Sequence, residues 1–289
     1  MLAAHDLSFH AGPRALVDRV SLNVASGEFV AIAGPNGAGK TTLLKMLAQE
    51  TAPGTGTIVL NGLPLGDWRA LERARMLAVL PQESRLAFAF TGLEVALFGR
   101  YPHRGGVIGK SDRAIAHEAL AMADAAHLAE RDFTTLSGGE KARVQLARVL
   151  AQLWTPCVID GKRQPRFLLL DEPTAALDLK HQHATLQAAR DFARREGDVG
   201  IIAVLHDLNL AAQYAGHLLL MQQGCIAAQG PPAQVLTVEC VEAVFEIKVN
   251  VLRRPDSGAP LIVAAHDGLI ASASWNTPAT PVTPEREAA

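Results

Sequence analysis

Cysteine is scarce in this chain. The 289 residues include three cysteines, Cys157, Cys225 and Cys240. They are odd in number, widely spaced and flanked by apolar residues, so a disulfide framework and a metal site are both disfavoured. We expect them to be small core residues of a protein that folds in a reducing compartment.

The chain also lacks an excess of either charge and any long apolar run. Its 27 basic and 29 acidic residues leave a formal charge of −2 and are spread along the sequence. Because no basic stripe is present, nucleic acid is not an expected partner. No stretch reaches the roughly 18 uncharged apolar residues that span a bilayer, and the N-terminal stretch MLAAHDLSFH lacks the features of a secretory leader. We expect a cytosolic chain, and docking on a membrane protein stays open.

Apolar residues are nevertheless abundant, at 49% of the sequence. That content supports a sizeable core in one large domain or in a domain with insertions. Short apolar runs alternate with helical patterns, which favours a mostly parallel sheet covered by helices. The runs that predict strands are 21–24, 29–33, 58–60, 77–80, 167–170 and 200–205.

The middle of the chain has a different character. From about 93 to 154, alanine, leucine and glutamate replace the β-branched runs, and the i, i+3, i+4 spacing of apolar residues indicates helices. We therefore expect a helical subdomain at about 84–154, inserted into a main domain over 1–250. The stretch VIDGKRQP at 158–165 is interpreted as a polar loop.

The end of the chain is expected to hold two small antiparallel features and a tail. Residues 217–230 predict two strands joined at Gln223-Gly224. A strand over 249–254 is expected to pair with the run 261–264 across the turn PDSG. Residues 251–271 are expected to form a small C-terminal extension. Residues 272–289 contain three prolines and almost no apolar residues, which predicts a disordered tail.

The most specific motif is GPNGAGKT at 34–41, which matches G-x-x-x-x-G-K-[ST] in full and lies between an apolar run and a helical pattern. Glycines are needed there because a Cβ would obstruct a backbone that turns its N–H groups around phosphates, and the dipole of the following helix adds to the same site. Lys40 is expected to reach the β and γ phosphates of ATP, and the Thr41 hydroxyl to ligate Mg²⁺. The predicted ATP-binding residues are Gly34, Pro35, Asn36, Gly37, Ala38, Gly39, Lys40, Thr41, Thr42 and Gln82.

Acidic residues follow a second apolar run in FLLLDEPTAALD, 167–178. Asp171 is expected at the carboxyl end of a strand, where open α/β sheets bind ligands, as a partner of Mg²⁺. Glu172 adjoins the buried strand, and a carboxylate there can polarise the water that attacks the γ phosphate. His206 ends another apolar run and is interpreted as a γ-phosphate sensor. The amide of Gln82 is a candidate ligand of Mg²⁺ or of water.

A second sequence with phosphate-binding character, TTLSGGEKARVQ, occupies 134–145. Ser137 and Glu140 form an S-x-x-E capping box at the start of a helix. Capping needs no glycine pair, whereas Gly138 and Gly139 leave the first amides open to an anion. Because the chain's own phosphates are already cradled at 34–41, this stretch is expected to face the γ phosphate held by another copy.

Taken together, these motifs resemble those of the ATP-binding cassette (ABC) ATPases over roughly residues 2–245. The resemblance rests on GPNGAGKT, LPQE, LSGGE, LLLDEP, AALD and His206, which occur in the family's order. It implies an α/β fold with a P-loop (RecA-type), mostly parallel core, an N-terminal antiparallel β part and a helical insertion. It also implies Glu172 as catalytic base, His206 at the γ phosphate, and a metal site of Thr41, Gln82 and Asp171.

The resemblance further implies an ATP sandwich made by two copies. In it, Ser137, Gly138 and Gly139 would act in trans, and Asp178 would lie at the dimer seam. One position departs from the family pattern, because the family stacks adenine on an aromatic residue near the N-terminus and alignment places Ala11 there. The alternatives are that His10 or Phe9 substitutes, or that stacking is weak.

Within the family, VALFGRYPHR at 95–104 resembles a stretch of the ATPases of iron-siderophore, haem and cobalamin importers. The loop at 158–165 and the segment after Asn250 resemble the haemin-import ATPases. The resemblance implies an ATPase, working with ATP and Mg²⁺ on the cytoplasmic face of the inner membrane, that powers haem uptake. The implied partners are a second copy, two integral-membrane permease subunits and, indirectly, a periplasmic substrate-binding protein.

Other functions stay open at this point. The chain could serve a ferric-siderophore or cobalamin importer, or be an ABC ATPase outside transport. An ATP-dependent scaffold is a further alternative, and Glu172 argues against it. The histidines of KHQH, His181 and His183, are expected to be solvated on a surface helix rather than to bind haem or metal.

Overall fold

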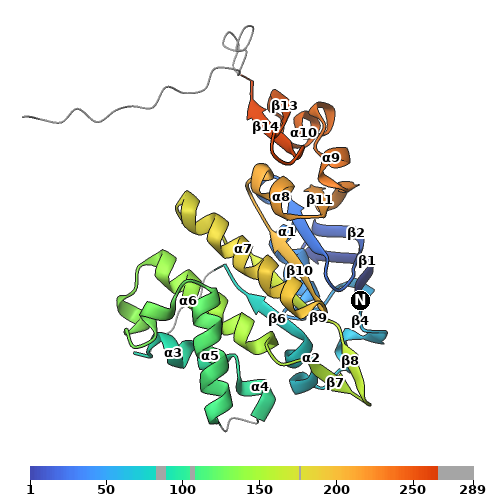
Figure 1. Ribbon diagram of the computed structural model, residues 1–289. Helices are drawn as coiled ribbons and strands as arrows, with labels where there is room; N and C mark the ends of the chain where they lie inside the picture. The colour runs from blue at the N-terminus through green and yellow to red at the C-terminus, as the bar shows by residue number, and fades with distance from the viewer. Residues whose placement is uncertain (83–88, 105–107, 176, 266–289) are drawn as a thin grey trace, which may run out of the picture.

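The computed structural model describes residues 1–82, 89–104, 108–175 and 177–265 (Figure 1). At its centre is a six-stranded sheet in which neighbouring strands pair in parallel, apart from one antiparallel pair at an edge. Its strands, in spatial order, are β12 (Cys225–Gly230), β11 (His217–Gln222), β3 (Phe29–Ala33), β10 (Val199–Val204), β9 (Arg166–Asp171) and β6 (Leu77–Leu80). The mostly parallel sheet confirms the predicted fold class.

The central strands are apolar throughout because both faces of the sheet are covered. In β3, Ala31 and Ala33 belong to a core shared with the helices of the middle of the chain. The alternate residues, Val30 and Ile32, belong to a second core on the opposite face. A strand with two buried faces has no reason to alternate polar and apolar residues, which is why FVAIA reads as one continuous apolar run.

A second, antiparallel sheet covers one of these faces. Its strands, in spatial order, are β2 (Arg14–Val24), β1 (Leu2–Ala11), β4 (Thr55–Leu60) and β5 (Leu63–Pro64). The sequence predicted only the inner ends of β2 and β4, at 21–24 and 58–60, because their outer halves carry polar residues and glycine. These strands supply the antiparallel part of the expected fold.

Helices surround the central sheet. The helical group between 92 and 153 confirms the helical character predicted for the middle of the chain, and it lies to one side of the sheet (Figure 1). It comprises α3 (Gly92–Phe98), α4 (Tyr101–Arg104), α5 (Lys110–Met122) and α6 (Gly138–Leu153). The other α-helices are α1 (Lys40–Leu47), α2 (Ala70–Met76), α7 (Leu179–Glu196), α8 (Leu208–Tyr214), α9 (Pro232–Val235) and α10 (Val238–Phe245). Short 3₁₀ segments lie at Leu65–Asp67, Ala126–Leu128 and Phe133–Thr135.

The stretch 158–165 is not a loop, so that interpretation was wrong. β7 (Cys157–Ile159) and β8 (Lys162–Gln164) pair as a hairpin. Its two turn residues, Asp160 and Gly161, both have positive φ, 49° and 71°. Asp-Gly is a typical sequence for a two-residue turn of this kind, so the signal was present but its flanking strands are too short and polar to be recognised.

Two C-terminal hairpins match the prediction. β11 and β12 are joined at Gln223-Gly224, and β13 (Val249–Arg253) pairs antiparallel with β14 (Pro260–Ala264). Asn209 of α8 ties the last hairpin to the body, because it bonds both the backbone N–H and the carbonyl of Ile262, at 2.7 and 3.1 Å. The predicted tail at 272–289, residues 84–88 and residues 266–271 lie outside the described residues.

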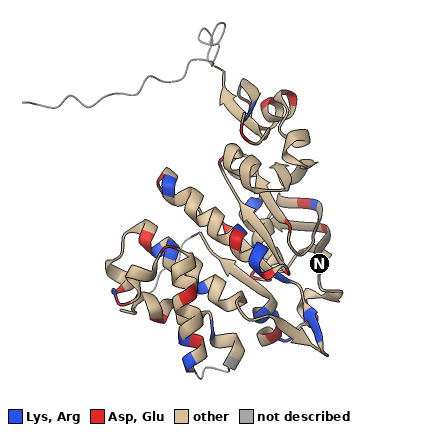
Figure 2. Ribbon diagram, viewed as in Figure 1, with Lys and Arg blue, Asp and Glu red and all other residues tan. Residues whose placement is uncertain are grey.

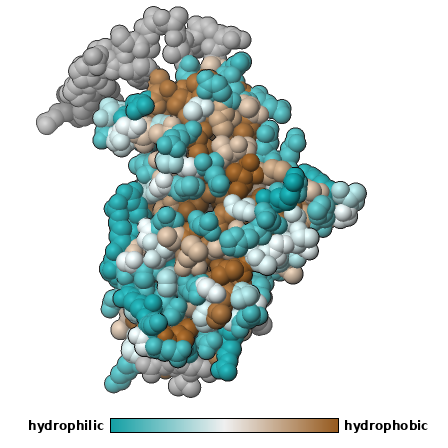
Figure 3. Space-filling model, turned by 90° about the vertical axis from the view of Figure 1, so that its right-hand side faces the viewer, coloured by the Kyte–Doolittle hydropathy of each residue, from teal (hydrophilic) through white to brown (hydrophobic). Residues whose placement is uncertain are grey.

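The surface is mixed in character. Basic and acidic residues are interspersed along the ribbon, as on α7 (Figure 2), and one face shows apolar patches separated by hydrophilic residues (Figure 3). In the described ranges, no helix combines the length and apolarity needed to cross a membrane. Cys157 is buried as expected and Cys240 is half-buried, whereas Cys225 is exposed, so the expectation of a core position was wrong for Cys225.

Candidate active site

The glycine-rich loop leaves the carboxyl end of β3 and leads directly into α1. Gly34 and Gly39 adopt positive φ, 149° and 98°. A Cβ at Gly34 would lie 2.1 Å from the carbonyl oxygen of Met221, and one at Gly39 would lie 2.1 Å from that of Leu16. Glycine is therefore required at both positions by the close approach of neighbouring backbone as well as by conformation.

Lys40 is held inside the curve of this loop. Its Nζ donates hydrogen bonds to the carbonyl oxygens of Gly34 and Pro35, both at 2.9 Å, and the residue is only 5% exposed. Burial lowers the pKa of the Lys40 ammonium, and the carboxylates of Glu172 and Asp171 act in the opposite direction. A cation enclosed by backbone and adjacent to two acids is poised to bind the oxygens of a polyphosphate.

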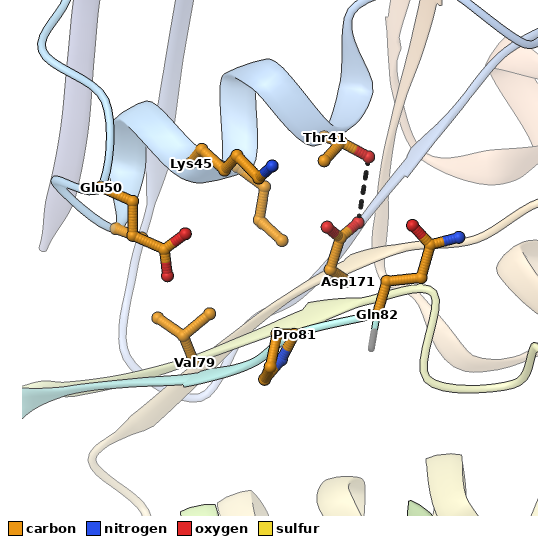
Figure 4. Close-up of a pocket in the computed structure, with 9 residues that line it drawn as sticks. Thr41, Lys45, Glu50, Val79, Pro81, Gln82 and Asp171 are labelled. Atoms are coloured by element: carbon orange, nitrogen blue, oxygen red, sulfur yellow. Dashed lines mark hydrogen bonds between the residues drawn. The ribbon is translucent and has the colours of Figure 1, made fainter. Parts of the chain in front are cut away.

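Thr41 and Asp171 face each other across the sheet's edge. The Thr41 hydroxyl donates to Asp171 Oδ1 at 3.2 Å, and both line a cavity with Lys45, Glu50 and Gln82 (Figure 4). Burial raises the pKa of Asp171, the bond from Thr41 lowers it, and the neighbouring charge of Glu172 raises it. A buried carboxylate of this kind is stabilised by a nearby cation.

The donors at this point fit Mg²⁺. Figure 4 shows the side-chain oxygen of Gln82 on the side that faces Asp171, so hydroxyl, carboxylate and amide oxygens point to one small space. Mg²⁺ prefers hard oxygen ligands and keeps several of its waters, so it does not need a protein cage. Elsewhere in the described chain no group of three or more His, Cys, Asp or Glu side chains is arranged for a metal.

Glu172 lies beside these residues and is held from two directions. Gln82 Nε2 donates to Glu172 Oε2, and His206 Nε2 lies against Glu172 Oε1, each at 2.5 Å. Glu172 has φ of 50°, a left-handed conformation that costs a non-glycine residue on the order of 1–3 kcal/mol. Its surroundings therefore hold the carboxylate in an orientation that local preference does not favour.

His206 lies two residues beyond the end of β10 and two residues before the start of α8. The next residue, Asp207, caps that helix by accepting from the backbone N–H groups of Asn209 and Leu210, at 2.7 and 3.2 Å. The His206 side chain is 46% exposed, so it reaches both Glu172 and the open cavity. Its position matches the one predicted from the end of the apolar run.

One cavity collects most of the predicted nucleotide residues. It is lined by Arg14, Leu16, the loop residues 36–42, Glu172 and His206. The sequence analysis did not identify Arg14 and Leu16 as site residues. The one sequence feature that points to their position is the two-residue turn Gly12-Pro13, which folds β2 back along β1. Neither of the proposed substitutes for the missing aromatic residue lines this cavity: Phe9 packs against an apolar core, and His10 is exposed on β1.

The second phosphate-like sequence is not part of this cavity. Ser137 accepts from the backbone N–H of Glu140 at 3.3 Å, and the Glu140 carboxylate accepts from the N–H of Ser137 at 2.8 Å, which confirms the predicted capping box. The bond from the Ser137 amide is the main reason that the pKa of Glu140 is lowered. The backbone at Gly139 comes close to Leu177, because a Cβ built at Gly139 would lie 3.3 Å from Leu177 Cδ2. Gly139 thus lies beside Leu177, the residue before Asp178, and none of these residues lines the cavity of the chain's own loop.

Asp178 begins α7. Its carboxylate accepts from the backbone N–H of His181 at 2.9 Å and lies 2.8 Å from His181 Nδ1, and the first of these contacts is the main reason that the pKa of Asp178 is lowered. His183 contacts the Tyr214 hydroxyl through Nδ1 at 2.9 Å. Both histidines are half-buried and bonded, so the expectation that they are simply solvated was wrong.

The geometry defines a P-loop nucleotide-binding protein. A glycine-rich loop runs from a parallel strand into a helix, an acidic pair stands at the end of a nearby strand, and a histidine ends the strand between them. Residues 17–175 match the family model described as ABC transporter.

Curated relatives place the chain more narrowly. The hemin import ATP-binding protein HmuV of Gloeobacter violaceus is 52% identical over 263 residues, which cover 91% of this chain and 94% of the relative. The HmuV protein of Pseudomonas aeruginosa is 49% identical over 264 residues, covering 91% and 100%. The chain therefore belongs to the ABC transporter family, as one of its ATP-binding, ATP-hydrolysing subunits.

Solved structures agree with this assignment. An ABC transporter of the metal-chelate type in an inward-facing conformation matches with a TM-score of 0.74 and 26% identity, over 93% of this chain and 99% of the other. A dimeric post-hydrolysis state of the ATP-binding cassette MJ0796, bound to ADP and Pi, matches with a TM-score of 0.69 and 27% identity, over 80% and 99%.

Proposed function

We propose that this chain is the ATP-hydrolysing subunit of an ABC importer that powers the uptake of haem across the cytoplasmic membrane. The observation that carries the proposal is its 52% identity, over 91% of its length, to a hemin import ATP-binding protein. A family match alone would support an ABC ATPase for any cargo, so the choice of haem rests on such relatives.

In the proposed reaction, residues 34–42 bind the phosphates of ATP, and Lys40 turns from its backbone partners to the β and γ phosphates. Mg²⁺, when bound, would neutralise phosphate charge, and the residues that would hold it are Thr41, Asp171 and Gln82. The space that these oxygens share beside the loop supports this assignment.

Glu172 is proposed as the catalytic base. Its carboxylate is oriented by Gln82 and His206, and it still has lone pairs to accept a proton from the water that attacks the γ phosphate. His206, which reaches into the cavity, would contact the same phosphate and keep Glu172 aligned. The strained backbone at Glu172 supports this assignment, because strain of this kind concentrates at functional sites.

The active assembly is proposed to contain two copies. Ser137, Gly138, Gly139 and Asp178 of one copy would complete the site on the other, as two halves of an ATP sandwich. Their absence from the lining of the chain's own cavity supports this arrangement, as does the dimeric state of the solved relative that binds ADP and Pi.

The importer is proposed to include two integral-membrane permease subunits, with a periplasmic substrate-binding protein acting indirectly. The chain would then lie peripherally on the cytoplasmic face of the membrane. We assign 1–250 to the ATPase domain, about 84–154 to a helical subdomain that contacts the permease, and 251–271 to a C-terminal extension. The word import in the relatives' names supports the direction of transport.

A second cargo class deserves a test because the chain also resembles a transporter of the metal-chelate type. A ferric siderophore or cobalamin would be the cargo in that case. The deciding experiment measures ATPase activity in proteoliposomes that contain the chain and its permease. Substrate-binding proteins loaded with haem, with ferric siderophore or with cobalamin are then added in turn.

We expect stimulation by the haem-loaded protein and none by the other two. Stimulation by another ligand would overturn the cargo assignment while leaving the ATPase assignment in place. A Lys40→Ala chain serves as control and should abolish activity in every case; activity that survives in this variant would contradict the assigned nucleotide site.

A further inference from the structure

Part of the wall of the phosphate cavity is made by the start of β2, directly after the turn from β1. The tight turn pairs Ala11 of β1 with Arg14 of β2. Residues two apart on a strand project to the same side, and both Arg14 and Leu16 line the cavity. This part of the wall therefore presents a guanidinium and an isobutyl group, and no Phe, Tyr or Trp is among the described residues that line the cavity.

The Arg14 guanidinium reaches over the loop itself. A Cβ built on Gly37 would lie 3.5 Å from Arg14 Nη2, so the cation borders the space that a side chain at this glycine would fill. Arg14 is exposed, and within the described part of the chain no hydrogen bond or ion pair is recorded for its side chain. By contrast, Arg163 and Arg166 are both committed to Asp198. The Arg14 guanidinium is thus a planar cation that is available to a ligand.

The direction of a bound triphosphate follows from where Glu172 and His206, and where Arg14 and Leu16, line the cavity. This step rests on the proposed function, in which the γ phosphate lies beside Glu172 and His206. Glu172 acts on the charge of Lys40, whereas Arg14 Nη2 approaches Gly37, so the two groups adjoin different residues of the loop. The nucleoside then extends away from Glu172 and His206, toward the part of the cavity lined by Arg14 and Leu16. The phosphates themselves already have Lys40 and the loop amides as partners.

We propose that Arg14 is the residue on which the base of the nucleotide stacks, with Leu16 as an apolar contact beside it. A guanidinium is planar and weakly hydrated, and it stacks on aromatic faces in a way that an ammonium cannot. Ala11, the cross-strand partner of Arg14, carries only a methyl group beside it. Because this contact reads no donor or acceptor of the base, ATP and GTP should bind with similar affinity.

The test is isothermal titration of the full-length chain with Mg²⁺ and either ATP, GTP or inorganic tripolyphosphate, which lacks a base. For Arg14→Ala we expect a loss of roughly 5- to 30-fold in affinity for both nucleotides and less than about twofold for tripolyphosphate. Arg14→Lys should behave like Arg14→Ala, because it keeps the charge and loses the plane. Arg14→Tyr should restore nucleotide affinity.

Three outcomes would overturn the proposal: an equal loss for tripolyphosphate, recovery by Arg14→Lys but not by Arg14→Tyr, or unchanged ATP affinity in Arg14→Ala. The first two would make Arg14 a phosphate contact. Lys40→Ala separates this proposal from the one on which it rests, because it should weaken all three ligands together. If Lys40→Ala keeps full ATP affinity, the nucleotide site itself is misassigned.

Discussion

Two glycine-containing sequences of this chain start helices, and their surroundings differ. At 34–42, residues from the ends of three neighbouring parallel strands converge. Lys40, Glu172 and His206 line one cavity, and Asp171 lines a second cavity that shares Thr41 with the first. At 137–140, the side chains of the helix start bond only within its own capping box and, through Glu140, to Arg131, within the described residues. The first sequence therefore lies next to the candidate catalytic residues of its own chain, whereas the second provides only a helix N-terminus.

The glycines of the two sequences also differ in their surroundings. A side chain at Gly34 or Gly39 would collide with backbone at 2.1 Å, so the fold of the chain itself demands glycine there. A Cβ at Gly138 would meet no described atom within 4 Å, and its φ is not positive. Nothing in its own described surroundings requires glycine at 138, which is the expected pattern if the space is reserved for a ligand held by another chain.

The largest expected effect comes from the self-contained site. Glu172→Gln keeps the hydrogen-bonding shape of the side chain but removes its basicity, so ATP turnover should fall by roughly 10²- to 10⁴-fold while ATP affinity is retained. Steady-state phosphate release and ATP titration measure the two effects. Glu239→Gln, the same change at an exposed position of α10, is the matched control. Undiminished turnover in Glu172→Gln would remove Glu172 from the catalytic role.

The second region should respond differently. Ser137→Arg places a bulky cation at the helix start that we assign to the partner's phosphate. Turnover should fall by about 10²-fold or more, and ATP affinity should change by less than about twofold. Ser257→Arg, in the exposed turn between β13 and β14, is the control. Loss of ATP binding in Ser137→Arg would mean that this stretch acts within its own chain.

Gly138→Ala sharpens the comparison further. Alanine has the higher helix propensity and the added methyl has open space, so the free energy of unfolding should change by less than about 1 kcal/mol. Turnover should nevertheless fall by about tenfold, because the methyl intrudes on a shared interface. Thermal unfolding and phosphate release check both points. A loss of stability without a loss of turnover would contradict the assignment.

The smallest effect concerns acid stability in the helical group that carries the second sequence. Burial lowers the pKa of His103 to about 4, and its Nε2 contacts the carbonyl oxygen of Gln152 in α6 at 2.7 Å. Between pH of about 6.5 and about 4 the unfolded chain binds this proton and the folded chain does not, so stability falls as pH falls through that window.

His103→Gln keeps a donor for the same carbonyl but does not titrate. Thermal unfolding of both proteins at pH 7.5 and pH 5 should show a smaller acid-induced loss in the variant. Equal losses in the two proteins would mean that His103 does not contribute to the acid sensitivity.

Local sequence patterns predicted the first and last residues of some strands correctly. β3 and β6 are apolar runs bounded by glycine or proline, and their observed limits are the predicted ones. The hairpin at 157–164 was missed because its strands are three residues long and one contains Lys162 and Arg163. Its Asp-Gly turn was the one local signal.

The site was less accessible to sequence reasoning where it depends on tertiary contacts. Thr41, Asp171 and His206 were placed correctly at strand or helix ends, since parallel strands end at a common edge. Gln82 and His206 both contact Glu172, and these contacts join three segments that are far apart in the sequence. No local sequence pattern predicts such contacts. Arg14 was missed for the same reason, because its relevance comes from pairing across a turn and not from any motif.

The central claim is that each nucleotide site is completed by a second copy, and ATP-dependent dimerisation tests it most directly. Sedimentation of the Glu172→Gln chain with Mg²⁺ and ATP should show a doubled mass that disappears without nucleotide. The double variant Glu172→Gln, Ser137→Arg should still bind ATP but remain at the mass of one chain. A Glu172→Gln chain that stays monomeric when saturated with ATP, or a double variant that dimerises as well as the single one, would contradict the account.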